Sequence, residues 1–178
     1  IVLRSDWQGV GKGVFAKYFG SLLGDHFTTV TEGRHLHGNF NAHQKKCLFL
    51  LGDEAVWGGD KRAEAKLKEM ITEPTTICEF KGKDSFQIKS FIRLMLQTNS
   101  EWAAPVSLTD RRYFVLDVSE MRLNDHVFFK EVENEKKNGG AEALLNVLQQ
   151  FDLSDFEVRE FPDTPARQEQ KLLSMQPL

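Results

Sequence analysis

A loop near the start of the chain combines glycines and a lysine in an order typical of phosphate binding. The stretch reads SDWQGVGKGVFAKYFG, and its core residues are Gln8, Gly9, Val10, Gly11, Lys12 and Gly13. Glycines let backbone N–H groups curl around phosphate oxygens at the start of a helix, and the lysine then reaches the β- and γ-phosphates. On the loop alone, the alternative is a tight turn before a helix with Lys12 in solvent.

Two positions of this loop depart from the usual phosphate-loop pattern. Asp6 stands at the position of the first glycine, and Gly13 stands where a Ser or Thr hydroxyl usually ligates Mg²⁺. We expect Asp6 to point outward, because a carboxylate facing a triphosphate would repel it. Mg²⁺ keeps several waters in most sites, so a water could replace the missing hydroxyl. We therefore expect nucleotide binding, with the rate of hydrolysis left open.

An acidic pair forms the second candidate group. Asp53 and Glu54 end the apolar run CLFLLGDE, which is typical of a central strand in a parallel sheet. Ligands of open α/β sheets bind at the carboxyl ends of such strands. There Asp53 could hold Mg²⁺, and Glu54 could orient and deprotonate an attacking water. The alternative is a pair of solvated acids that opens a loop.

Further polar groups follow two later strands. Asn99 ends the run FIRLMLQTN and could hydrogen-bond a γ-phosphate or the attacking water, although a lone asparagine there is more often a turn residue. Arg111 and Arg112 follow Asp110, and arginine stabilises charge on a transferring phosphoryl group, from its own subunit or from a neighbour. The alternative is ion pairing at a strand edge, which we expect for one of the two arginines.

Strands that alternate with helices must position these groups. The pattern predicts strands at about residues 1–3, 26–30, 47–54, 91–99 and 110–118, and helices at about 11–23, 60–72, 125–137 and 141–150. A β-hairpin is predicted before the strand that ends at Asn99, with Lys81 and Lys83 at its tip. This order argues for an α/β fold with a mostly parallel sheet flanked by helices. We expect residues 1–120 to form the core and residues 121–178 a C-terminal helical segment and tail.

Composition narrows the class of protein. A chain of 178 residues suffices for one domain, and its net charge of -3 gives no overall basic field. Nucleic-acid binding would therefore need a local patch or a surface shared between subunits. Cys47 and Cys78 indicate reduced core thiols of a cytoplasmic protein. Neither a membrane span nor a signal peptide is evident, and we expect the chain to be a piece of a longer polypeptide.

Taken in order, these motifs resemble the helicase domain of phage and plasmid primase-helicases, a superfamily 3 helicase-like branch of the AAA+ P-loop ATPases. The resemblance runs from QGVGKG through LGDEA, LKEMITE, FKGKD and LQTNS to DRRYFVLDV, and it extends to the tail VREFPDTPARQEQK. It implies ATP and Mg²⁺ as cofactors. By this resemblance the site residues are Lys12 as phosphate lysine, Asp53 and Glu54 as acidic pair, Asn99 as sensor and Arg111 or Arg112 as arginine finger.

The resemblance also implies a role for the hairpin. In superfamily 3 helicases, a β-hairpin before the sensor asparagine projects into the channel of a ring and contacts single-stranded DNA. Lys81 and Lys83 would then form a positive collar for the phosphate backbone, although KGKD alone is more often a soluble turn.

The expected function is the ATP-dependent DNA helicase or translocase core of a phage- or plasmid-like replication protein. We expect a hexameric ring in the cytoplasm of a bacterial host, with a primase or polymerase domain in the same full-length chain. The alternative is a ring-forming DNA-binding module that holds nucleotide without efficient hydrolysis, which Gly13 motivates. A small-molecule P-loop kinase fits poorly, because a sensor asparagine and paired arginines follow the hairpin.

Overall fold

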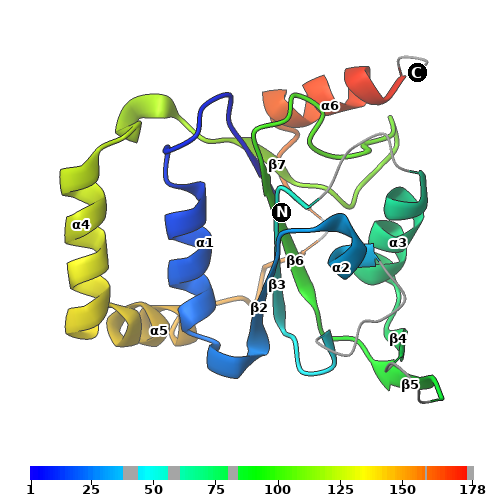
Figure 1. Ribbon diagram of the computed structural model, residues 1–178, viewed down its shortest axis with the longest axis horizontal. Coiled ribbons are helices and arrows are strands. Elements are labelled where there is room, and N and C mark those ends of the chain that lie inside the picture. Colours follow the sequence, from blue (N-terminus) through cyan, green and yellow to red (C-terminus); the bar gives the residue numbers. More distant parts are fainter. Residues whose placement is uncertain (38–43, 56–60, 80–83, 159, 176–178) are drawn as a thin grey trace.

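A five-stranded parallel sheet forms the centre of the molecule. The computed structural model describes residues 1–37, 44–55, 61–79, 84–158 and 160–175 (Figure 1). The sheet has the order β2-β3-β6-β1-β7, and every pairing in it is parallel. Its strands are β1 (Val2–Arg4), β2 (Phe27–Val30), β3 (Phe49–Asp53), β6 (Arg93–Thr98) and β7 (Val115–Asp117). The prediction of a mixed α/β fold with a mostly parallel sheet is confirmed.

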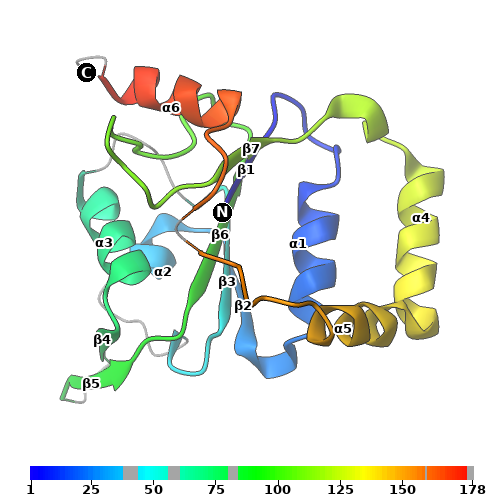
Figure 2. The same ribbon diagram turned by 180° about the vertical axis from the view of Figure 1, so that it is seen from behind.

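Helices cover both faces of this sheet, which explains why the middle residues of β3 and β6 are apolar and buried. Helix α1 (Lys12–Ser21) covers one face, and α2 (Gly33–His37) and α3 (Lys61–Thr72) cover the other, as the two opposite views show (Figures 1 and 2). On the α1 face, Ala16 packs against Leu51 and Met95. On the other face, Leu67 of α3 packs against Leu50 and Leu96. Alternate residues of each strand thus enter two separate cores.

The C-terminal third adds a second layer outside α1 and one further helix beside β7 (Figure 1). Helix α4 (His126–Glu135) is followed by a kink at residues 136–140, where Asn138 and Gly139 have non-helical backbone angles, and the chain then enters α5 (Ala141–Gln149). Asp125 caps α4 by accepting a hydrogen bond from the backbone N–H of Phe128 at 3.0 Å. Helix α6 (Pro165–Met175) returns to the sheet beside β7 (Figure 1). The predicted division at residue 120 stays a prediction.

The hairpin before β6 is present as a separate two-stranded sheet. Strands β4 (Thr75–Cys78) and β5 (Phe86–Lys89) pair antiparallel, as predicted. Lys81 and Lys83 lie outside the described residues. Short 3₁₀ turns complete the elements at Gly24–His26 and Glu120–Arg122.

Two local predictions differ from the structure. The strand predicted from residue 110 begins only at Val115, because the Asp110 carboxylate accepts a hydrogen bond from the backbone N–H of Arg112 at 2.6 Å and holds a turn there. The segment from Gly33, to which the sequence pattern assigned neither helix nor strand, begins with the short helix α2, whose Leu36 is buried in the core. Cys47 and Cys78 are buried free thiols, as predicted.

Candidate functional site

A cavity of about 640 Å³ opens at the carboxyl ends of β1, β3 and β6. Its floor is the loop of residues 8–13, and the strand ends contribute Asp53, Glu54, Gln97 and Asn99. Its outer wall comes from α1 and from the segment that begins α4. This is the edge at which open parallel sheets bind ligands. The loop and the strand-end residues that the sequence singled out therefore lie around one cavity.

The loop has a backbone that only glycine adopts readily. Gly9 has φ 82° and Gly11 has φ 103°, in the left-handed region. A Cβ on Gly9 would lie 2.4 Å from Asn124 Oδ1, and one on Gly11 would lie 2.7 Å from Phe129 Cε1. Glycine is thus required at both positions by conformation and by packing. The turn delivers the chain to the N-terminus of α1, whose first backbone N–H groups lack helical partners and suit an anion.

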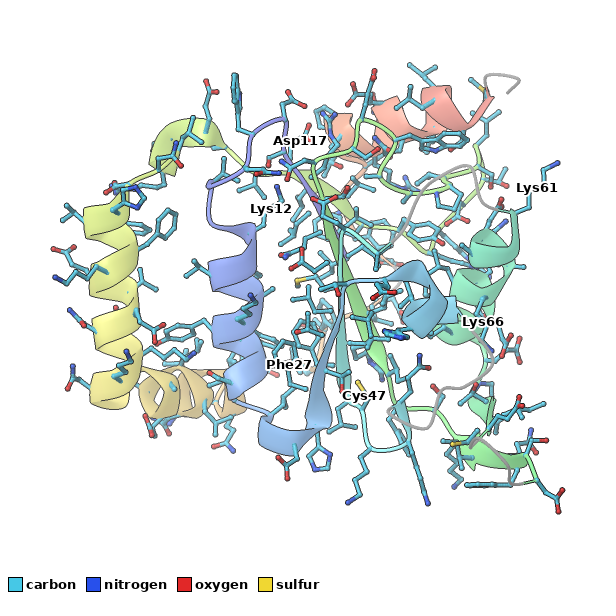
Figure 3. The ribbon with its side chains drawn as sticks, in the orientation of Figure 1. Lys12, Phe27, Cys47, Lys61, Lys66 and Asp117 are labelled. Carbon is cyan, nitrogen blue, oxygen red and sulfur yellow. The ribbon has the colours of Figure 1, made fainter. Side chains whose placement is uncertain are left out.

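Lys12 is the first residue of α1 and is only 8 % exposed. Figure 3 shows its side chain between α1 and the sheet, and its Nζ donates to Ser5 Oγ at 2.5 Å. Burial lowers the pKa of Lys12 below its ordinary value, whereas Glu54 and Asp53 act in the opposite direction. A buried ammonium facing two carboxylates is placed to meet an anion inside the cavity.

The acidic pair lies at the end of β3, where Asp53 is the last residue of the strand and Glu54 follows it. Glu54 has φ 53°, an uncommon conformation for a residue other than glycine. Its carboxylate accepts hydrogen bonds from Thr98 Oγ1 at 2.7 Å and from the backbone N–H of Asn99 at 2.8 Å. Such strained residues cluster at functional sites, where the surrounding structure must hold them. The β6 end thus fixes the Glu54 carboxylate at the cavity.

Asn99 connects the ends of β6 and β1. Its Nδ2 donates to the Ser5 carbonyl at 2.8 Å and to Ser5 Oγ at 3.3 Å, the same hydroxyl that accepts from Lys12. The Asn99 amide and the Lys12 ammonium therefore share Ser5 Oγ as a hydrogen-bond acceptor. The structure brings together the glycine–lysine loop, Asp53, Glu54 and Asn99.

Gln97 lines the cavity and was not predicted. It pairs with Asp53 in the register of β3 and β6, and it continues the α1-facing row of Met95. It is 5 % exposed, yet its Oε1 has no hydrogen-bond partner among the described residues. A Cβ on Gly13 would lie 3.5 Å from its Nε2. The available signal was an amide that directly follows the apolar stretch LML within the strand.

The outer wall of the cavity was also missed. The residues that line it from α1 and from the start of α4 onward are Lys17, Tyr18, Asn124, His126, Phe129, Glu133 and Lys136. The pattern predicted a helix at about residues 125–137, but nothing local in the sequence indicates which face of the core that helix covers. Its position became visible only in the packing of Phe129 against Gly11.

The two arginines lie apart from this cavity. Arg112 forms an ion pair with the buried Asp110 at 3.0 Å, the bonding expected for one of the pair. Arg111 is exposed, and neither arginine is among the residues that line the cavity.

Asp6 is exposed and its carboxylate lies 3.4 Å from Arg4, so it points away from the loop as expected.

The donor set fits a magnesium–nucleotide complex better than a protein-only metal site. No cluster of three His, Cys, Asp or Glu side chains that could hold a metal occurs in the described part of the chain. Mg²⁺ is usually held by one or two carboxylates together with phosphate oxygens and waters. Asp53 and the unpartnered Gln97 oxygen are oxygen donors of this kind, and the backbone N–H groups of the glycine loop suit phosphate oxygens. None of the described helices is long and apolar enough to cross a membrane.

Comparison with solved structures shows the same fold in the C-terminal region of NrS-1. The apo structure of its residues 305–718 has a TM-score of 0.83 at 18% identity, covering 99% of this chain and 43% of that one. A second apo structure of that region, in the A form, gives a TM-score of 0.81 at 18% identity, covering 98% and 42%. The chain thus spans less than half the length of these structures. A search of curated protein sequences found no significant match.

The family assignment rests on a sequence profile. The profile of DUF5906, a family of unknown function, matches residues 3–112, which include the loop, the acidic pair, Asn99 and both arginines. The match covers more than half of the chain. The chain therefore belongs to the DUF5906 family.

Proposed function

We propose that this chain binds ATP with Mg²⁺ in the cavity and forms the ATPase core of a DNA helicase or translocase. One observation carries the proposal. The glycine cradle and the buried Lys12 at the start of α1 share a single cavity with Asp53, Glu54 and Asn99 at the ends of adjacent parallel strands. This combination of a phosphate-binding helix N-terminus with an acidic strand end is what phosphoryl transfer to water requires.

Each residue then has a distinct task. The backbone N–H groups of residues 9–12 and the Lys12 ammonium bind the phosphates, and Asp53 would hold Mg²⁺. When bound, the ion neutralises charge that develops on the phosphate oxygens. Glu54, fixed by two hydrogen bonds from the end of β6, orients a water and accepts its proton. Asn99 shares Ser5 with Lys12 and responds when the lysine turns toward the γ-phosphate.

The oligomeric part of the proposal concerns the arginines and the hairpin. Arg111 is exposed and lies outside the cavity of its own subunit, which supports a role at the site of a neighbouring subunit in a hexameric ring. Arg112 is held by Asp110 and serves to fix the turn that presents Arg111. The β4–β5 hairpin would carry Lys81 and Lys83 to single-stranded DNA in the ring channel.

A second candidate is a module that binds nucleotide and DNA without efficient hydrolysis. Gly13 favours it, because the loop lacks the hydroxyl that usually ligates Mg²⁺. Both candidates require ATP binding, and they differ in turnover. Steady-state ATPase activity with Mg²⁺, measured with and without single-stranded DNA, therefore separates them.

The same assay tests the role of Glu54. Glu54→Gln keeps the size of the side chain and removes its basicity, so we expect intact ATP binding and loss of turnover by roughly 100-fold or more. Glu131→Gln is the matched control, because Glu131 is an exposed residue of α4 that does not line the cavity. If the wild type is active and Glu54→Gln has the same turnover, Glu54 is not the general base. An assembled, DNA-bound wild type without turnover would favour the second candidate.

A further inference from the structure

The unpartnered amide oxygen of Gln97 lies beside the position where the loop lacks a hydroxyl. We propose that Gln97 Oε1 supplies the oxygen toward Mg²⁺ that Gly13 does not provide. The inference deepens the proposed function and rests on it, because it concerns the metal bound with the nucleotide in the same cavity. It assigns a ligand role to a residue that no motif of the loop or of the acidic pair contains.

Three features of Gln97 carry this inference. Its side chain is buried and lines the cavity, yet its Oε1 has no partner among the described residues. Buried polar atoms of native proteins nearly always have partners, so an orphaned oxygen on a side chain that lines a cavity indicates a missing partner. Gln97 also stands opposite Asp53 in the parallel register, which places both side chains on the α1 face of the sheet. An amide oxygen and a carboxylate are both ligands that Mg²⁺ accepts.

The absence of a side chain at Gly13 is the complementary feature. A Cβ built there would lie 3.5 Å from Gln97 Nε2 and 4.0 Å from Gln97 Oε1. A hydroxyl one bond further would thus reach the space that the Gln97 amide adjoins. Glycine at residue 13 and glutamine at residue 97 are therefore alternative ways to place one oxygen in the same small region between α1 and β6.

The test measures the metal dependence of nucleotide binding and does not need turnover. A fluorescent ATP analogue is titrated with the protein in Mg²⁺ and again in EDTA. The ratio of the dissociation constant in EDTA to that in Mg²⁺ reports how much the ion contributes to binding. Gln97→Met preserves side-chain volume and removes the oxygen. We expect this variant to lower the ratio roughly 10-fold, a typical effect of losing one partner of a bound metal, with binding in EDTA unchanged.

The decisive measurement restores an oxygen at residue 13. Gly13→Ser in the Gln97→Met background should recover most of the ratio, whereas Gly13→Ser alone should change it little. Gln44→Met is the control for loss of a buried amide, because Gln44 is buried but does not line this cavity. It should leave the ratio unchanged. If Gln97→Met does not fold, Gln97→Glu decides: it should raise the ratio, and a fall or no change would overturn the inference.

The outcomes separate this inference from the proposed function. If the wild type binds the analogue in neither buffer, the proposed function fails and the inference fails with it. If the wild type shows metal-dependent binding and Gln97→Met shows the same ratio, the inference alone is overturned. If the ratio falls in Gln97→Met and Gly13→Ser does not restore it in that background, the inference that Gln97 supplies the oxygen that Gly13 lacks is overturned.

Discussion

The loop of residues 8–13 packs against Phe129 of α4 at Gly11, and adding a single methyl group at Gly11 tests this contact. Gly11 has φ 103° and ψ 2°, and Gly139 has φ 93° and ψ 1°, so the two backbones are nearly the same. A Cβ on Gly11 would lie 2.7 Å from Phe129 Cε1, whereas a Cβ on Gly139 would meet nothing within 4 Å. Gly139→Ala is therefore a matched control for Gly11→Ala.

The magnitude follows from two terms. The left-handed conformation costs about 1–2 kcal/mol for an alanine at either position. The collision with a packed aromatic ring adds about 1–3 kcal/mol at Gly11 alone. We therefore expect Gly139→Ala to lower the free energy of unfolding by about 1–2 kcal/mol and Gly11→Ala by about 2–5 kcal/mol.

Urea unfolding of both variants gives the two values, and a double-mutant cycle identifies the cause. Phe129→Ala removes the ring, so the additional loss at Gly11 should disappear in the Gly11→Ala, Phe129→Ala double variant. Gly11→Ala should also weaken ATP binding, because it displaces the cradle, while Gly139→Ala should not. Equal losses of stability in the two glycine variants would refute the claim that α4 packs against the loop.

Three further predictions concern stability and DNA binding. Tyr113→Phe should be neutral or stabilising by up to about 1 kcal/mol, because the buried Tyr113 hydroxyl has no partner among the described residues. Burial raises the pKa of Tyr113 above its value in the unfolded chain. The free energy of unfolding of the wild type should therefore fall as pH rises above about 10. Urea titrations at several pH values should show a smaller fall for Tyr113→Phe. Arg4→Met should lower the free energy of unfolding by about 2 kcal/mol, since buried Arg4 donates to Asp117 at 2.8 Å, and Asp117→Asn should reproduce part of this loss. Replacing Lys81 and Lys83 with alanine should weaken single-stranded DNA binding and reduce the slope of log affinity against log salt by about 1.4; an unchanged slope would remove the lysines from the DNA contact.

The strands could be predicted because burial on both faces leaves a plain apolar run. The runs that end at Asp53 and Asn99 are β3 and β6 with small changes in length. The turn before α1 was predictable as well, because its glycines allow the left-handed backbone that leads the chain into the helix. The order of the strands was not, since pairing of β1 with β6 and β7 joins segments roughly a hundred residues apart, and no local pattern records it.

The missed parts of the site share one physical cause. Gln97 gains its meaning from its register with Asp53 and its distance from Gly13, which are properties of three separate segments. Phe129 belongs to an amphipathic helix that could have covered several faces of the core. In both cases the side chain type was visible, and the tertiary contact that makes it part of the site was not.

The central claim is that the loop amides and Lys12 bind the phosphates of ATP. Isothermal titration of the protein with ATP and Mg²⁺, compared with Lys12→Met, tests it most directly. We expect saturable binding by the wild type, and a loss of roughly 10- to 100-fold in affinity for Lys12→Met, the effect of removing one charge-assisted hydrogen bond. Absence of binding by the wild type, or equal affinity for the two proteins, would contradict the account.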